Sequence, residues 1–396
     1  MAGPLKGVRV LDLSRVLAGP FCAMILGDLG AEVIKVERPG VGDETRAWGP
    51  PYVGGESAYY LCANRNKKSI TLNLKTEEGR RILRELILRS DVVIENFRTG
   101  TMEGWGLGYE DLKPLHPGLI YCKITGYGSE GPARDRPGYD FILQAESGWM
   151  SITGPVEGPP FKVGVAVVDV VTALFAAIAI LAALAERSRS GHGQKVEISL
   201  LECALASLVN VASNYLVSSV PPRRYGNAHP NIVPYEAFET ADGYIVIAVG
   251  NDSQFRALCE CIGRAELAED PRFATNSQRV MNRDLLIPIL REIIRRRSTQ
   301  EWLRALLPAG VPAGAVRTIP EALSDPQAQA LNMVVEVPHP RAGRIRMIRS
   351  PLNFSRTPVA IIRHPPILGE HTQEVLVDLL GYEPEAIDQL RAQEII

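Results

Sequence analysis

The first 130 residues alternate between short apolar runs and longer segments with helical spacing. Residues 18–30 carry apolar side chains at helical spacing up to a glycine stop, between two short apolar runs. A second helix is expected over residues 76–90, opened by Thr76. Strands are expected over residues 7–13, 31–39, 69–74, 91–97 and 119–128. Strands that alternate with helices pair in parallel, so the pattern predicts a Rossmann-like α/β domain.

The most apolar passage covers residues 163–184 and contains one ionisable residue, Asp169. After Asp169 the apolar run spans only 16 residues, 170–185, whereas a bilayer core requires about 20. Basic residues and glycines follow in residues 186–194, as is typical of a helix C-terminus. We therefore expect a buried core helix with Asp169 at or near its N-terminal end.

Burying a lone carboxylate costs several kcal/mol unless it is paired or used. One interpretation of Asp169 is a helix N-cap, since unpaired N–H groups and the helix dipole favour a negative charge there. The other is a desolvated nucleophile, because residues 163–168 resemble a buried extended stretch. The pattern by itself leaves both open.

The remaining chain predicts further elements. Residues 193–216 indicate a strand followed by a second apolar helix, and the turn-rich residues 218–231 indicate a boundary. Hairpins are expected around Asp242-Gly243 and Ala342-Gly343, with mostly helical structure over residues 252–325.

Composition narrows the class of protein. The chain has 396 residues, 46% of them hydrophobic and 22% charged, and a net charge of −2, so it provides no basic footprint for nucleic acid or an anionic membrane. The six cysteines show no CxxC pair or zinc-finger spacing, which favours reduced thiols and no metal site. The chain opens on a strand pattern without a signal-peptide h-region, and we expect a cytoplasmic protein.

Candidate ligand contacts lie where strands end, since ligands of parallel sheets bind beyond the carboxyl ends. Arg38, Lys75 and Arg98 lie at the carboxyl ends of three of the expected strands and could together hold phosphates. Arg38 after Glu37 favours a phosphorylated ribose. The chain lacks GxGxxG after its first strand, which argues against a nicotinamide oxidoreductase.

Ordered blocks along the chain resemble the class III CoA-transferases, the formyl-CoA and L-carnitine CoA-transferase family. They are LKGVRVLDLSRVLAGP, LGDLGAEVIKVERPGVGDETR, NRNKKSITLNLK, DVVIENFRTG, ITGYGSEGP, RPGYDFILQAESG, VGVAVVD, GHGQKVEISLLE and PPILGEHTQEVL. The resemblance implies a large Rossmann-like domain and a smaller α+β domain in an interlocked-ring homodimer. We expect the large domain to start with residues 1–217, the small domain to cover residues 226–325, and residues 330–396 to return to the large domain.

The resemblance also implies the chemistry. Asp169 would attack the donor acyl-CoA to give a mixed aspartyl anhydride and then an aspartyl-CoA thioester, with backbone N–H groups nearby stabilising the oxyanions. Acyl-CoA and a small carboxylic acid are then the substrates, with no other cofactor. By family analogy coenzyme A contacts Leu17, Ala18, Arg38, Leu72, Asn73, Leu74, Lys75, Asn96, Phe97, Arg98, Pro137, Gly138, Tyr139 and Asp140.

Departures from the family pattern separate its branches. The α-methylacyl-CoA racemases read GHD where this chain has Gly138-Tyr139-Asp140. A tyrosine is a poor proton shuttle at neutral pH, which argues against racemase activity and leaves it as the alternative function. Formyl-CoA:oxalate transferases carry glutamine at the position of Leu17 and a glycine-run loop that is missing here. A non-catalytic CoA-binding scaffold would tolerate loss of Asp169, which is present within its motif.

The segment NAHPNIVPYEAFETADGYIVIAVGNDSQF resembles the branch of succinyl-CoA:glutarate and related dicarboxylate enzymes. A dicarboxylate acceptor needs a cation or donor cluster for its distal carboxylate. The candidates are Arg15, Arg46, Arg65 and the loop residue His229, while Glu146 is either close to the active site or a helix-surface residue.

Overall fold

The computed structural model describes residues 3–396 and divides into two compact units. The first unit contains the residues up to Trp149 together with Val163–Leu216 and Pro326–Ile396. The second unit contains Met150–Lys162 and Val217–Asp325. Arg224 ties the two parts of the second unit together by donating to the carbonyl oxygens of Pro155 at 2.9 Å and Gly158 at 2.7 Å.

A six-stranded, entirely parallel sheet forms the centre of the first unit, in the order β5-β2-β1-β6-β7-β8. Its strands are β1 (Arg9–Asp12), β2 (Glu32–Glu37), β5 (Lys67–Thr71), β6 (Val92–Glu95), β7 (Ile120–Thr125) and β8 (Lys195–Ser199). The parallel sheet expected from the alternating pattern is confirmed.

One strand differs from its prediction. The pattern predicted residues 69–74, but β5 begins at Lys67 and ends at Thr71. Lys67 is fully buried, and its ammonium donates to Asp12 at 2.9 Å, so a charged residue occupies a core position of the strand. Leu72, Asn73 and Leu74 consequently lie beyond the strand, at the edge of the sheet.

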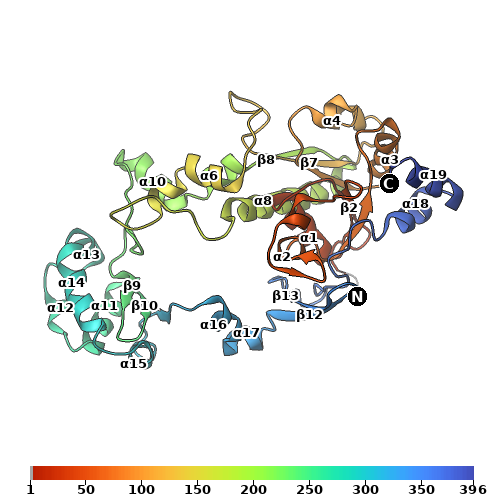
Figure 1. Ribbon diagram of the computed structural model, residues 1–396. Helices are drawn as coiled ribbons and strands as arrows, with labels where there is room; N and C mark the ends of the chain where they lie inside the picture. The colour runs from red at the N-terminus through yellow and green to blue at the C-terminus, as the bar shows by residue number, and fades with distance from the viewer. Residues whose placement is uncertain (1–2) are drawn as a thin grey trace. The chain divides into compact units, whose positions relative to one another are not determined.

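Successive residues of a strand point to opposite faces of the sheet, and apolar side chains lie on both faces here. Helices therefore cover both faces. On one face, α1 (Ala18–Asp28) and α8 (Val167–Ser190) pack against alternating residues such as Val10, Val33 and Ile94. On the other face, α3 (Glu77–Leu88), α18 (Thr372–Leu380) and α19 (Pro384–Ala392) pack against Leu11, Ile34 and Val93. The first unit is therefore a three-layer α/β/α arrangement, and α18 lies beside α3 (Figure 1).

Shorter elements complete the first unit. They are η1 (Glu44–Ala47), β3 (Tyr52–Val53), β4 (Glu56–Ser57), α2 (Ala58–Leu61), α4 (Thr101–Gly104), α5 (Tyr109–Leu112), α6 (Asp140–Glu146), α9 (Leu200–Ala206), α17 (Pro326–Ala330), β12 (Val334–His339) and β13 (Gly343–Ile348). Two helices, α7 (Trp149–Ile152) and α10 (Val209–Ser218), lie at passages to the second unit. The antiparallel β12–β13 hairpin turns between His339 and Gly343, which confirms the hairpin predicted around Ala342-Gly343.

The second apolar helix predicted within residues 193–216 is wrong as a single element. After β8 the chain forms α9 and α10, and the two helices are bent by 71°. Ser207 Oγ donates back to the carbonyl of Cys203 at 2.7 Å, and Val209 has a positive φ of 42°. A left-handed valine breaks the helical repeat, and apolar spacing alone does not predict such a residue.

Helix α8 has 24 residues and, by length and composition, is long and apolar enough to cross a membrane. The same properties belong to core helices. One stripe of α8, which includes Ala173, Ala176 and Ile180, is buried in the cluster shared with α1. Its other side exposes Leu174, Phe175 and Ile178.

The second unit contains a three-stranded antiparallel sheet in the order β11-β10-β9, surrounded by helices. Its elements are β9 (Tyr235–Glu239), β10 (Tyr244–Ala248), α11 (Asp252–Cys261), α12 (Glu266–Glu269), α13 (Asn276–Met281), α14 (Arg283–Ile294), α15 (Thr299–Leu306), β11 (Ala313–Ala315) and α16 (Ile319–Ser324). Glu239 pairs with Tyr244, which confirms the hairpin around Asp242-Gly243. Strand β11 lies within a stretch predicted as mostly helical.

Candidate active site

Asp169 lies in the first turn of α8, at its third residue. The N-cap position belongs to Ala166, whose side chain makes no capping hydrogen bond, so the N-cap interpretation of Asp169 is wrong. The stretch before it is also not buried as expected, since Val165 is 63% exposed. The Asp169 carboxylate is therefore left available for another role.

The capping role belongs to Asp140, the first residue of α6. Its Oδ1 accepts the N–H of Val168 at 2.7 Å and the N–H of Asp169 at 3.3 Å. The second oxygen of Asp140 accepts from Gln144 Nε2 at 2.7 Å, and Gln144 Oε1 accepts the N–H of Val163 at 2.8 Å. Gln144 is fully buried. Asp140 and Gln144 thus fix the backbone on both sides of the helix start.

The other N–H groups at the start of α8 are also satisfied. Val167 donates to the carbonyl of Val165 at 2.8 Å, and Val170 donates to that of Ala166 at 3.1 Å. The expected use of these N–H groups for oxyanions is therefore not supported, since Asp140 and the backbone accept their hydrogen bonds. At the start of α1, by contrast, the N–H groups of Leu17, Ala18 and Gly19 have no acceptor within residues 3–396.

The surroundings of Asp169 favour its neutral form. Burial, and next the negative charge of Asp140, raise the pKa of Asp169 from 3.8 to about 7. Within the described part of the chain no basic side chain forms an ion pair with it. A carboxylate that ionises near neutral pH in a poorly solvated place keeps its lone pairs available for attack on a carbonyl carbon.

Tyr59 on α2 also belongs to this site and was missed by the sequence analysis. Burial first, and then the charges of Asp169, Cys62 and Asp140, raise the pKa of Tyr59 to about 12. Its ring and the ring of Trp48 pack in a T-shaped arrangement, with the ring centroids 5.1 Å apart. The Tyr59 phenol therefore stays protonated at neutral pH, and the charges of both carboxylates act on it. Within the sequence GESAYYL nothing in the spacing distinguishes Tyr59 from a core tyrosine.

The residues predicted to contact coenzyme A gather at the carboxyl edge of the sheet. Leu17 is the N-cap of α1 and Ala18 its first residue, Asp140 is the first residue of α6 and caps α8, and the others follow strand ends or precede α6. Arg38 follows β2, Leu72, Asn73, Leu74 and Lys75 follow β5, Asn96, Phe97 and Arg98 follow β6, and Pro137, Gly138 and Tyr139 precede α6. Because β5, β2, β1 and β6 are consecutive neighbours, the topology brings these segments together.

Three cations in this group are free for a ligand. Arg38, Lys75 and Arg98 are exposed, and none has an ion-pair partner among residues 3–396. Their positions suit the phosphates of a nucleotide. Arg15 is exposed as well, but it pairs with Glu44 at 2.7 Å and lies over the ring of Phe97.

Two other arginines already form buried ion pairs and are therefore not available to bind the carboxylate of an acceptor, which corrects the hypothesis that they do so. Arg46 pairs with Glu37 at 2.7 Å, and Arg65 pairs with Asp28 at 2.6 Å. All four side chains are largely buried. Removing an arginine from such a pair leaves a buried charge without compensation, so these guanidinium groups hold the fold together.

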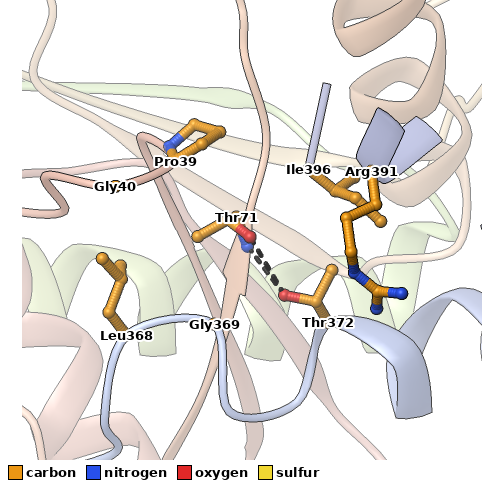
Figure 2. A pocket seen from close by; sticks show the side chains of 8 residues that line it. All are labelled: Pro39, Gly40, Thr71, Leu368, Gly369, Thr372, Arg391 and Ile396. Carbon is orange, nitrogen blue, oxygen red and sulfur yellow. Dashed lines mark hydrogen bonds between the residues drawn. The ribbon is translucent and has the colours of Figure 1, made fainter. Parts of the chain in front are cut away.

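A cavity of about 320 Å³ lies beside this edge of the sheet. Its lining residues are Pro39, Gly40, Thr71, Leu368, Gly369, Thr372, Arg391 and Ile396. Figure 2 shows Thr71 and Thr372 in its middle, where Thr372 Oγ1 accepts the N–H of Thr71 at 3.0 Å. Pro39 and Thr71 immediately neighbour Arg38 and Leu72, so the cavity adjoins two of the predicted CoA-binding segments.

The structure also shows whether Glu146 and His229, the two remaining candidates from the sequence, could act in the site. Glu146 is exposed, accepts from Arg136 at 2.6 Å and from Tyr127 at 2.7 Å, and so is a surface ion pair. His229 lies in the second unit, where its Nδ1 accepts the N–H of Asn231 at 3.0 Å. Burial and the neighbouring Arg283 lower the pKa of His229, so it is neutral at pH 7 and offers no cation for a carboxylate.

Comparison with known proteins places the chain in a family. Residues 5–372 match the model of CoA-transferase family III. Human succinyl-CoA:glutarate CoA-transferase is 45% identical over 393 residues, which cover 99% of this chain and 90% of that protein. Succinate–glutarate CoA-transferase of Agrobacterium fabrum is 47% identical, with 97% of each chain covered. The crystal structure of a CaiB/BaiF family protein from Brucella suis has a TM-score of 0.85 at 45% identity, covering 96% of this chain and all of that one.

Proposed function

The chain belongs to CoA-transferase family III, and we propose that it moves coenzyme A from an acyl-CoA donor such as succinyl-CoA to a free dicarboxylic acid, with Asp169 as the covalent nucleophile. The observation that carries this proposal is the Asp169 carboxylate, which lies next to the Asp140–α8 contact with no cation beside it in the described chain. The names of the relatives support the dicarboxylate, since they include glutarate, citramalate and mesaconate transferases.

The proposed reaction balances without another reactant. A carboxylate oxygen of Asp169 attacks the thioester carbonyl, the C–S bond breaks, and coenzyme A leaves as a thiolate, which leaves a mixed anhydride on Asp169. The thiolate attacks the Asp169 carbonyl carbon and releases the donor acid as a carboxylate. The acceptor carboxylate then attacks this aspartyl-CoA thioester, the thiolate leaves again, and its attack on the acceptor carbonyl gives the new acyl-CoA and free Asp169.

Stabilisation of the oxyanions is proposed to come from donors other than the start of α8. The N–H groups of Ala18 and Gly19 at the start of α1 support this role, because they lack acceptors in residues 3–396. Val168 at the start of α8 shares a hydrophobic cluster with Ala18. The Tyr59 hydroxyl is a second donor, since the charge of Asp169 acts on it.

Coenzyme A is proposed to lie along the carboxyl edge of the sheet. The free cations Arg38, Lys75 and Arg98 support binding of its phosphates, and the 320 Å³ cavity next to Arg38 and Leu72 is large enough for part of its nucleotide end. Arg15 is proposed for the distal carboxylate of the acceptor, because its pair with Glu44 is exposed and can be exchanged for a ligand, whereas Arg46 and Arg65 are held in buried pairs.

A homodimer with interlocked chains is proposed as the working state. The support is the apolar surface of α8 and α10, where Leu174, Phe175, Ile178 and Leu216 are exposed. Large exposed apolar patches mark protein–protein contact sites, and a second chain packed on α8 and α10 would cover these side chains. The described cysteines are all free, which supports a reducing compartment such as the cytoplasm.

The test is a panel of acyl-CoA donors and free acids assayed for CoA exchange with the wild type, Asp169→Ala and Asp169→Asn. We expect exchange between succinyl-CoA and a dicarboxylate such as glutarate, and loss of exchange in both variants. Hydroxylamine added during turnover should mark Asp169 as a hydroxamate in peptide mass spectra. Exchange that persists in Asp169→Ala, or a substrate α-carbon that takes up deuterium without exchange, contradicts the proposal and favours a racemase.

A further inference from the structure

The last helix of the chain, α19, ends in a turn that reverses the backbone. The N–H of Glu394 donates to the carbonyl of Arg391 at 3.1 Å, and the N–H of Ile395 donates to that of Leu390 at 2.9 Å. Between them Glu394 adopts a positive φ of 56°. This is a Schellman turn with glutamate in the left-handed position that glycine usually occupies.

The turn delivers the backbone of residues 394 and 395 to the segment that follows β5. The N–H of Asn73 donates to the carbonyl of Ile395 at 2.7 Å, and Asn73 Nδ2 donates to the carbonyl of Glu394 at 3.3 Å. Asn73 Oδ1 in turn accepts the N–H of Lys75 at 3.2 Å. Asn73 therefore links the end of α19 to Lys75 instead of presenting its amide freely to a ligand.

This contact is anchored in the core. Ile395 is buried together with Leu390, on the opposite side of the reversal, in the hydrophobic cluster that also contains Leu72. Ile396 and Arg391 line the 320 Å³ cavity, across from Pro39 and Gly40 (Figure 2). Residues 391–396 thus both brace the 72–75 segment and form one side of the cavity.

We propose that residues 391–396 are a positioning element of the coenzyme A site, setting the affinity for coenzyme A through the 72–75 segment and the cavity side while leaving the chemistry at Asp169 untouched. The inference rests on the proposed function, because it takes residues 72–75 and the cavity as the place of the nucleotide. The segment acts through backbone carbonyls, and the Glu394 side chain is exposed.

Two substitutions at Glu394 separate the turn from the side chain. Glu394→Pro removes the N–H that donates to Arg391, and a proline cannot adopt a φ of 56°. Glu394→Gly removes the same side chain and keeps the turn. We expect Glu394→Pro to weaken binding of free coenzyme A and raise the KM for the acyl-CoA donor, each about fivefold or more, with kcat and the KM for the acid within about twofold. Glu394→Gly is expected to bind coenzyme A as the wild type does.

Calorimetric titration with free coenzyme A measures binding independently of turnover, and amide hydrogen exchange over residues 390–396 reports whether the turn has opened. Ile387→Val on α19 is the control for stability, because Ile387 is buried in the same hydrophobic cluster but lies within the helix, before the terminal turn. An opened turn with an unchanged Kd for coenzyme A overturns the inference, as does an equal weakening in Ile387→Val. Absence of CoA exchange in the wild type instead contradicts the proposed function.

Discussion

Asp140 caps the helix that carries Asp169: one oxygen of the Asp140 carboxylate accepts the Asp169 N–H at 3.3 Å, and burial together with the charge of Asp140 raises the pKa of Asp169. The two aspartates therefore have separate tasks. Asp140 satisfies backbone donors, and Asp169, freed from capping, ionises near neutral pH. Because only the ionised carboxylate of Asp169 attacks, its pKa sets the pH dependence of the proposed reaction.

Replacing Asp140 with asparagine is expected to move the acidic limb of the activity profile. The attacking form of Asp169 is the carboxylate, so kcat/KM rises with pH, with its midpoint near 7, and reaches a plateau above it. The asparagine amide still offers an acceptor oxygen to Val168 and Asp169 but carries no charge, so the pKa of Asp169 falls and the limb shifts to lower pH by about half to one unit. The measurement is kcat/KM for succinyl-CoA between pH 5 and 9 (roughly two units on each side of the midpoint).

Asp140→Ala is the companion variant, because it removes the acceptor as well as the charge. It should lower the free energy of unfolding by about 1 kcal/mol through loss of the helix cap, whereas Asp140→Asn keeps that cap and loses only the hydrogen bond from Gln144 Nε2. A limb that stays in place in Asp140→Asn contradicts the electrostatic link between the two aspartates.

Asp169→Asn should abolish exchange and yet stabilise the fold above neutral pH. The folded pKa of Asp169 is about 7 and its ordinary value is 3.8, so the folded state binds the proton more tightly and stability declines as pH rises from about 4 to 7. Above pH 7 the full penalty of the buried charge is present. Removing it should add about 1–3 kcal/mol at pH 8, a figure reduced for the partial exposure of the carboxylate, and almost nothing near pH 4.

Urea unfolding of the wild type and Asp169→Asn at pH 5 and pH 8 checks this expectation. The gain at pH 8 must exceed that at pH 5. An equal or reversed difference means that the Asp169 carboxylate is well solvated or paired in the folded protein.

Lys35 and Asp43 form a buried ion pair that we expect to support the loop of residues 13–17, which leads from β1 into α1. Their charged atoms are 2.9 Å apart with both side chains fully buried, and Lys35 also donates to the Ser14 carbonyl at 2.8 Å. Asp43 accepts the N–H of Val16, which has a positive φ of 72°. Lys35→Met leaves Asp43 buried and uncompensated, and should lower the free energy of unfolding by about 3–5 kcal/mol.

The matched control is Arg344→Met, which breaks the exposed pair with Glu336 and should cost at most about 1 kcal/mol. Urea midpoints of both variants decide the comparison. The double variant Lys35→Met with Asp43→Asn should recover part of the loss, and the absence of any recovery means that Lys35 stabilises the loop without its charge.

Ile178→Glu tests the proposed dimer. Ile178 on α8 is 61% exposed, so a glutamate there is tolerated by a monomer but is desolvated in an interface. We expect the wild type to sediment at twice the chain mass of 43.3 kDa and Ile178→Glu to shift toward that mass. Ser188→Glu, on the exposed polar end of the same helix, is the control and should leave the mass unchanged. A monomeric wild type contradicts the dimer.

Part of the fold could be predicted because local patterns report it. The alternating strands and helices predicted the parallel sheet, and the two turn signals predicted both hairpins. The start of β5 was missed because Lys67 is buried against Asp12, and a sequence pattern assigns a lysine to the surface. The break between α9 and α10 was missed because it depends on the backbone of Val209.

Some features of the candidate site could likewise be predicted from the sequence, and others could not. Asp169 stands out in the sequence because a lone carboxylate in an apolar run requires an explanation, and strand ends single out Arg38, Lys75 and Arg98. Tyr59, the commitment of Arg46 and Arg65 to buried pairs, and the capping by Asp140 follow from contacts across the fold.

The sequence by itself determined the periodicities of the strands and helices, the sheet edge at which ligand contacts gather and the one charge inside the apolar passage, because each follows from neighbouring residues along the chain. Only the tertiary structure decided which carboxylate caps α8, which arginines remain free and that Asn73 meets Ile395, more than 300 residues away. Hydrogen bonds and desolvation depend on which groups approach in space, and that approach exists only once the sheet and its helices have packed.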